Sequence, residues 1–270
     1  RLIARIDTGS EEEALHQAID EDMFMNQAEF NLMMELAKKI LGKDCLGREA
    51  VEAALRIKIS EAEVPEMPFS EEELRRAKEL DQYLILRVDK TAYGEPITME
   101  RLGEKLQGGF EKKGLGKIFY KTDGYKNEVF FTKDKPRLKW ALVTKAVIPG
   151  STNKDYLDQT QAIADYLKNK VFAGRMLPVG YQQAIDEFNK AKNDLAKLME
   201  SDWKKAAEQL AKLELNQLTR QKPVEVIYDF LVYLITNDER LLESEYTWTM
   251  AQTSDGDLVF VGGADEDGAG

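Results

Sequence analysis

The chain has 270 residues, which is enough for one large domain or two small ones. Its hydrophobic content of 43% supports a packed core, and 49 acidic against 38 basic residues give a formal net charge of −11. Because such a charge repels phosphates, the composition argues against a non-specific nucleic-acid binder or a binder of anionic membranes.

Several kinds of chemistry lack their usual residues. The single cysteine, Cys45, excludes an internal disulfide and a cysteine-based zinc site. The only histidine, His16, lies in an acidic and exposed-looking context, which disfavours histidine-dependent catalysis and histidine metal sites. No apolar run approaches the ~20 residues of a membrane-spanning helix. No signal peptide is visible, the compartment stays open, and no cofactor is expected.

The first part of the chain is expected to be a helical region, residues 1–60. Ser10 and the acids after it are typical of a helix start, and Gly42 is typical of a helix end. A second helix is expected over 48–59. Residues 61–69 contain two prolines and three glutamates, which predicts an extended linker between this region and a second domain, 70–270.

The next stretch mixes short helices with strands. Ser70 and Glu73 form a capping-box pattern at the start of a helix to about Leu80. Residues 83–88 predict the strongest strand, which should be central or buried on both faces because four of its six residues are aliphatic. A short helix over 98–106 and breaks at the following glycines are also expected, with further strands at 116–120, 128–131 and 140–148.

Residues 154–213 are expected to form a helical insertion with solvated charged faces. After it, Pro223 fits the first turn of an apolar helix that runs from Val224 to Ile235. The fold class predicted by these separate blocks of helices and strands is α+β, with a small mixed sheet.

Two short β-rich segments, Tyr246–Thr249 and Leu258–Val261, follow this helix. Asp255-Gly256 between them is a strong hairpin signal. The glycine- and aspartate-rich residues 262–270 are expected to bury nothing, either as a flexible tail or because a further strand follows.

Local strings along residues 70–262 resemble an uncharacterised bacterial protein group of the candidate phyla radiation. The group ends in a C-type-lectin-like domain related to formylglycine-generating enzymes and resembles the variable proteins of diversity-generating retroelements. The strings that carry the resemblance are 83–88, Phe130-Phe-Thr-Lys-Asp134, Trp140-Ala-Leu-Val143, Ser201-Asp-Trp-Lys204, Asn216-Gln-Leu-Thr-Arg-Gln221, Pro223-Val-Glu-Val226 and Tyr246-Thr-Trp-Thr249. The chain departs from the group after Gly270, where a tryptophan-containing loop and a closing strand would follow and pair with the first strand.

The resemblance implies a non-enzymatic protein that binds a protein or another ligand through a hypervariable surface on the C-terminal hairpin. The positions that would face the ligand are Thr253, Asp255, Asp257, Phe260, Gly263, Asp265 and Asp267. Leu258, Val259 and Val261 would be scaffold, although strict alternation places Leu258 on the same face as Phe260. An ordinary hairpin with solvated acids is the alternative.

Other functions stay open. The helical region 1–60 could act as an assembly module or support a homo-oligomer. A carboxylate-dependent hydrolase is a further alternative, because acid pairs are always available in so acidic a chain. Asp265-Glu-Asp-Gly268 resembles the front of a calcium loop but lacks the spaced acid that would close it, so no metal is expected.

Overall fold

A computed structural model describes residues 29–270, and the predictions for Ser10 and His16 lie outside them. Helical residues 29–41 come first. The elements up to the insertion are η1 Gly42–Asp44, β1 Cys45–Leu46, α2 Arg48–Leu55, η2 Glu61–Glu63, α3 Glu71–Glu79, β2 Gln82–Arg87, α4 Met99–Lys112, η3 Thr122–Gly124, α5 Val129–Thr132 and β3 Lys139–Thr144. The elements that follow are α6 Tyr156–Tyr166, the π-helical turn η4 Leu167–Val171, α7 Val179–Ser201, α8 Trp203–Lys212, α9 Glu214–Thr219, α10 Pro223–Asn237, β4 Tyr246–Gln252 and β5 Leu258–Gly262.

The described chain has a mixed α+β architecture, as the sequence predicts, and its strands form two small sheets where one was expected. In the three-stranded sheet, β2 is central, parallel to β1 and antiparallel to β3. All six residues of β2 are buried, which confirms the prediction for this strand. The second sheet is the β4–β5 hairpin, which pairs with neither β1 nor β3.

One hydrophobic core joins the N-terminal helices to the sheet. Buried side chains from 37–59, β2, α4 and α10 belong to the same cluster. The proposed linker 61–69 crosses the surface of this core: Val64, Met67 and Phe69 pack against it, and Trp140 Nε1 donates a hydrogen bond to the carbonyl of Pro65 at 2.8 Å. The segment therefore lies over one core and does not separate two.

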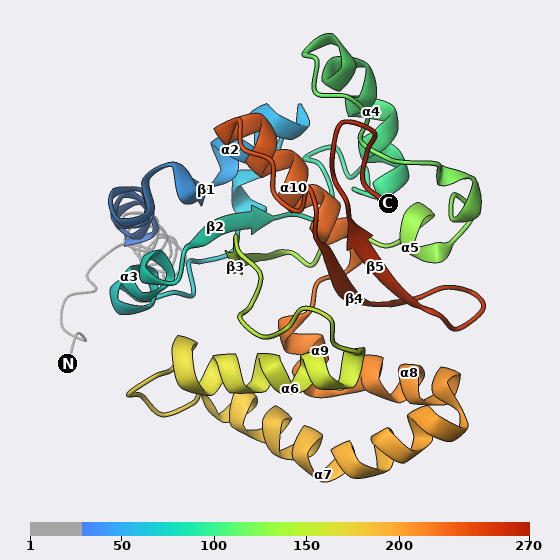
Figure 1. Ribbon diagram of the computed structural model, residues 1–270. Coiled ribbons are helices and arrows are strands. Elements are labelled where there is room, and N and C mark those ends of the chain that lie inside the picture. The colour runs from blue at the N-terminus through green and yellow to red at the C-terminus, as the bar shows by residue number, and fades with distance from the viewer. Residues whose placement is uncertain (1–28) are drawn as a thin grey trace, which may run out of the picture.

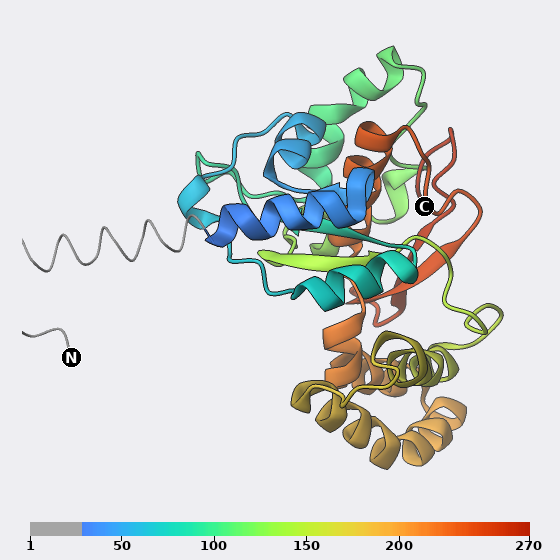
Figure 2. The ribbon, with the colours of Figure 1, turned by 90° about the vertical axis from the view of Figure 1, so that its left-hand side faces the viewer.

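The insertion has a hydrophobic core of its own, built from α6 to α9, and both views show it as a layer beneath the sheet and the hairpin (Figure 1 and Figure 2). Trp248 and Leu258 of the hairpin pack against this second core. The start of α8 is capped by Asp202, whose side chain accepts from the Lys205 N–H.

Three local predictions in the middle of the chain are wrong. Residues 128–131 do not form a strand: α5 is a short helix that packs on α4 and α10, with Phe130 and Phe131 both buried, so tertiary packing overrides β propensity. Residues 116–120 contribute only an isolated bridge. Gly108 and Gly109 do not end α4, which continues to Lys112 and places Gly109 against the guanidinium of Arg56.

The expectation that 262–270 buries nothing is also wrong. Ala264 and Ala269 are 2% and 3% exposed. The Ala269 N–H donates to the Ile118 carbonyl at 3.0 Å, and the Lys117 N–H donates to the Glu266 carbonyl at 2.9 Å. The segment thus pairs with the loop after α4, a long-range contact that its composition does not reveal.

Within residues 29–270, no helix has the length and apolar character needed to cross a membrane.

The fit between 262–270 and the loop after α4 can be tested at Gly116, whose φ is +80°. A Cβ at this position would collide with the carbonyl of Glu266. We expect Gly116→Ala to lower the free energy of unfolding by about 1–3 kcal/mol in urea titrations, because it adds both backbone strain and a clash. Gly108→Ala is the matched control, since a Cβ added there would have no neighbour within 4 Å among the described residues. Equal stability of the two variants would contradict the packing described for the terminal segment.

Candidate recognition face on the C-terminal hairpin

Helix α10 is the central support of the candidate site. Every residue from Pro223 to Leu234 is buried, including Glu225 and Asp229. These two acids are four residues apart and therefore lie on the same face of the helix. The helix packs on α2, α4, β2 and both strands of the hairpin, so it links the sheet to the candidate site.

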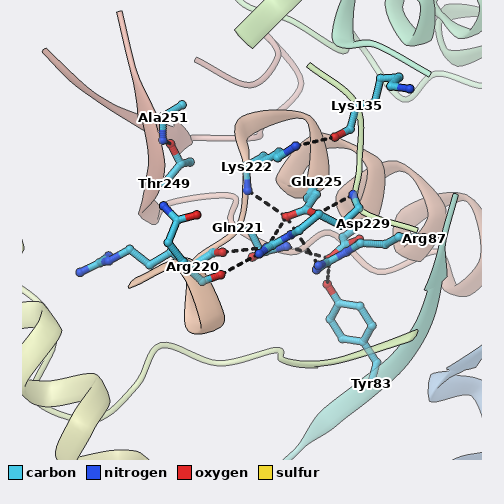
Figure 3. A network of polar contacts seen from close by, with 12 residues as sticks. Tyr83, Arg87, Lys135, Arg220, Gln221, Lys222, Glu225, Asp229, Thr249 and Ala251 are labelled. Carbon is cyan, nitrogen blue, oxygen red and sulfur yellow. Dashed lines mark hydrogen bonds and ion pairs between the residues drawn. The ribbon is translucent and has the colours of Figure 1, made fainter. Parts of the chain in front are cut away.

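Asp229 is paired with Arg87 at the end of β2 (Figure 3). Arg87 Nε and Nη2 donate to the two carboxylate oxygens at 3.0 and 2.5 Å, and both side chains are 2% exposed. Gln221 Nε2 and the Tyr83 hydroxyl add donors at 2.8 and 3.4 Å. Burial lowers the pKa of Arg87, but the adjacent Asp229 carboxylate outweighs burial and raises it, which keeps the guanidinium charged.

Glu225 is held by a second arginine. Arg137 Nε and Nη2 donate to its two oxygens at 2.8 and 2.7 Å, while the Arg137 N–H donates at 2.9 Å. Burial raises the pKa of Glu225, but the hydrogen bonds from Arg137 and the charges of Arg87 and Arg137 outweigh burial and lower it to about 2. Glu225 is therefore ionised at neutral pH.

The turn between α9 and α10 connects this ion cluster to the hairpin. The Gln221 side chain bonds to Asp229, while its carbonyl accepts from the Met250 N–H at 3.1 Å. Arg220 points away from the cluster in Figure 3; it donates to the Trp248 carbonyl at 3.3 Å and stacks on Tyr156 with its Cζ 3.9 Å from the ring centroid. Strand β4 is thus fixed at two nearby backbone positions.

The inner face of the hairpin is buried. Thr249, Val259 and Val261 are 0%, 9% and 4% exposed. The Thr249 hydroxyl donates to the Val259 carbonyl at 2.7 Å and accepts from the Ala251 N–H at 3.3 Å, in the region where the strand register shifts. These contacts fix the backbone of the hairpin from within.

The outer face carries three aromatic rings in contact. The Phe260 ring centroid lies 5.4 Å from that of Tyr246 and 5.1 Å from that of Trp248, in edge-to-face geometry. Tyr246 is 56% and Phe260 is 47% exposed, whereas Trp248 also packs edge-on against Tyr156 of α6. We call Tyr246, Trp248 and Phe260 the aromatic platform. Its rings are pre-ordered by their mutual contacts.

The seven positions implied to face a ligand occupy three places and do not converge on one point. Asp255 and Asp257 are exposed at the hairpin turn, where Thr253 is half-buried and its hydroxyl accepts from the Asp257 N–H. Phe260 lies in the platform. Gly263, Asp265 and Asp267 lie beyond the opposite end of β5; Gly263 contacts the Tyr246 hydroxyl, and both aspartates are exposed.

Sequence reasoning assigned Tyr246 and Trp248 to a strand but not to the recognition surface. Their spacing of two residues places both on one face of β4, and the register pairs Trp248 with Phe260, so strand periodicity could have found them. The scaffold residues Leu258, Val259 and Val261 are all packed against one of the two cores.

The hydrolase alternative needs free acids that converge on a cavity. A cavity of about 190 Å³ between the sheet, α6, α10 and β4 is lined by Tyr83, Gln159, Asp229 and Tyr246, among others. Its buried acid, Asp229, is already bonded to Arg87, Gln221 and Tyr83. Burial raises the pKa of Cys45 to about 11, so that thiol is not activated as a nucleophile at neutral pH.

Among residues 29–270, no group of three or more potential ligating side chains could hold a metal ion. The acids considered for calcium are split between the hairpin turn and the terminal segment, with β5 between them.

No protein-family model matches the chain, and comparisons with curated proteins and with solved structures gave no match.

The link between the ion cluster and the hairpin predicts a large effect for Asp229→Asn. Removing one partner of a buried ion pair leaves an uncompensated charge, so we expect the free energy of unfolding to fall by about 3–5 kcal/mol. Hydrogen exchange should also accelerate at the Met250 amide, which is bonded to Gln221. The double variant Arg87→Met, Asp229→Leu replaces both partners, and it should lower the free energy of unfolding less than Asp229→Asn alone. A loss below about 1 kcal/mol for Asp229→Asn would contradict a structural role for the pair.

Glu225 predicts a specific acid dependence of stability. Its pKa is lowered in the folded protein from 4.5 to about 2, so its contribution is complete above pH 4.5 and is lost as pH falls toward 2. The stability difference between the native protein and Glu225→Gln should therefore shrink by about 3 kcal/mol from pH 6 to pH 2, measured by urea unfolding. A difference independent of pH would show that Glu225 is not held ionised by Arg137.

Proposed function

We propose that the chain is a non-enzymatic ligand-binding protein and that its recognition surface is the outer face of the β4–β5 hairpin. The observation that carries the proposal is an exposed, pre-ordered aromatic platform whose strands are fixed from behind by α10. Exposed aromatic residues on a rigid support are the anchors that dominate binding energy in protein interfaces, because their large surfaces lose little conformational entropy on binding.

The variable-surface hypothesis is part of this proposal. Asp255, Asp257, Asp265 and Asp267 are exposed, so most side chains at these positions would project into solvent without disturbing either core. Gly263 is the exception: its φ is +55° and the Tyr246 hydroxyl occupies the space of a side chain, so a substitution there would be strained. We therefore expect variation at the four aspartates to be better tolerated than variation at Gly263.

We also propose a C-type-lectin-like scaffold, and the support for it is the order of the secondary-structure elements along the chain. A buried first strand, a helix before the Tyr246–Thr249 segment and a hairpin follow one another in the order that the resemblance implies. The pairing differs from that scaffold, because β2 pairs with β1 and β3 and not with the last strand of the described chain.

The test is capture of partners from a lysate of host or symbiont cells by the immobilised protein. Phe260→Ala should reduce recovery of any specific partner about tenfold, because it removes a central ring of the platform. Tyr93→Ala is the matched control, since Tyr93 is an aromatic residue 82% exposed far from the hairpin in sequence. If both variants recover equally less partner, or if Phe260→Ala recovers as much partner as the native protein, the hairpin is not the recognition surface. Turnover of a substrate by the purified protein would refute the non-enzymatic assignment.

A further inference from the structure

We infer that the partner recognised by the hairpin is cationic, namely a lysine- or arginine-rich segment of another protein whose charged side chains stack on the aromatic platform. This inference rests on the proposed function and adds the chemical class of the partner. It is carried by three properties of the same surface: exposed rings that no cation of the described residues covers, a local excess of carboxylates, and a strand pairing that brings the backbone of five of those acids to one end of the hairpin.

The first property concerns the rings. Elsewhere in the described chain, five aromatic rings each have a lysine or arginine over them, at Tyr120, Tyr156, Phe172, Trp203 and Phe230. Within residues 29–270, no lysine or arginine covers Tyr246, Trp248 or Phe260. The two exposed rings of the platform, Tyr246 and Phe260, therefore offer surfaces of the kind that this chain uses repeatedly to hold its own cations.

The second property is the charge of the chain around the platform. Residues 241–270 contain seven acidic residues and no lysine, arginine or histidine. All seven are exposed, and among the described residues none of them makes an ion pair. Such a field attracts cations and repels acidic ligands.

The third property is how the strands arrange these charges. Because β4 and β5 are antiparallel, Tyr246 pairs with Gly262, which brings the start of one strand beside the end of the other. The Gly263 N–H donates to the Glu245 carbonyl at 3.0 Å, and the Ala264 N–H donates to the Leu242 carbonyl at 2.9 Å. The backbone positions of five of the seven acids therefore lie within a few residues of these bonds, at the Tyr246 end of the platform: Glu243, Glu245, Asp265, Glu266 and Asp267.

The side chains of three basic residues bind the backbone of this region. Arg240 donates to the carbonyls of Ala264 and Asp265, and Lys204 donates to the carbonyl of Asp255. Arg220 donates to the carbonyl of Trp248. Their bonds hold the segment in place and leave its carboxylates open to a partner. A guanidinium or ammonium group on the platform would thus meet a ring face and nearby carboxylates together, which favours cations over neutral apolar ligands.

The experiment titrates the full chain with a fluorescein-labelled peptide of alternating arginine and glycine, and follows binding by fluorescence anisotropy. Glutamate–glycine and serine–glycine peptides of the same length are the controls. Phe260→Ala and Phe260→Leu leave the net charge unchanged, so they separate ring stacking from general attraction by an acidic protein. We expect each to weaken binding of the arginine peptide about tenfold, with Tyr93→Ala unchanged. Circular dichroism and thermal unfolding verify that each variant is folded.

The other outcomes separate this inference from the proposed function. Arginine-peptide binding that is unaffected by both Phe260 variants is general electrostatic attraction and would overturn the inference. If Phe260→Ala weakens binding of the arginine peptide but Phe260→Leu does not, the binding depends on apolar contact, and the inference is also overturned. Failure of the arginine peptide to bind would overturn it as well, while Phe260-dependent capture of a neutral or acidic protein would leave the proposed function standing. If no partner binds in a way that depends on Phe260, both the inference and the proposed function are refuted.

Discussion

The pairing of Arg87 with Asp229 is the constraint on which the rest of the structure depends. Two charges buried to 2% exposure are tolerated only when their hydrogen-bonding capacity is satisfied, and Gln221 and Tyr83 supply the remaining donors. The pair fixes one face of α10 against the end of β2. Glu225, one turn earlier, fixes the start of the same helix to Arg137. Together these contacts set the position and rotation of α10, whereas hydrophobic packing alone constrains rotation less strictly.

The position of the hairpin depends on helix α10. The Gln221 side chain is bonded to Asp229 in the ion cluster, and the Gln221 carbonyl is bonded to Met250 in β4. A single residue therefore links the strand to the core. Val259 and Val261 then cover α10 and leave the opposite face of the hairpin toward solvent and the edge of the insertion. An arrangement of this kind gives a surface whose backbone is rigid while its outer side chains are free to differ, which is what a variable recognition surface requires.

The sequence predicted the elements whose signal is local. The buried strand over 83–88, the helix after Pro223 and the hairpin around Asp255-Gly256 are all present, because their periodicity and turn residues determine them directly. The ion cluster was missed, since the two acids of α10 resemble a solvated face until the helix is known to be covered on all sides. Its only sequence signal is the i, i+4 spacing of Glu225 and Asp229 in an otherwise apolar helix, with Arg87 at the end of an apolar strand.

The remaining differences arise from contacts between distant segments. Residues 128–131 have strand-forming composition but become helical where Phe130 and Phe131 pack between α4 and α10. Residues 262–270 have the composition of a free tail but pair with 117–120 through backbone bonds that no local pattern encodes. The sequence indicates only part of the aromatic platform: the resemblance implies a ligand-facing role for Phe260, while Tyr246 and Trp248 become part of a surface only once the strand register is known.

The most direct test of the account is hydrogen–deuterium exchange of the chain with and without a captured partner. The account predicts that added protection is concentrated at 242–263, on both strands of the hairpin and the segment beside Tyr246, with α7 and the helical residues 29–41 unchanged. Protection concentrated on α7 or on 29–41, with the hairpin unaffected, would contradict it.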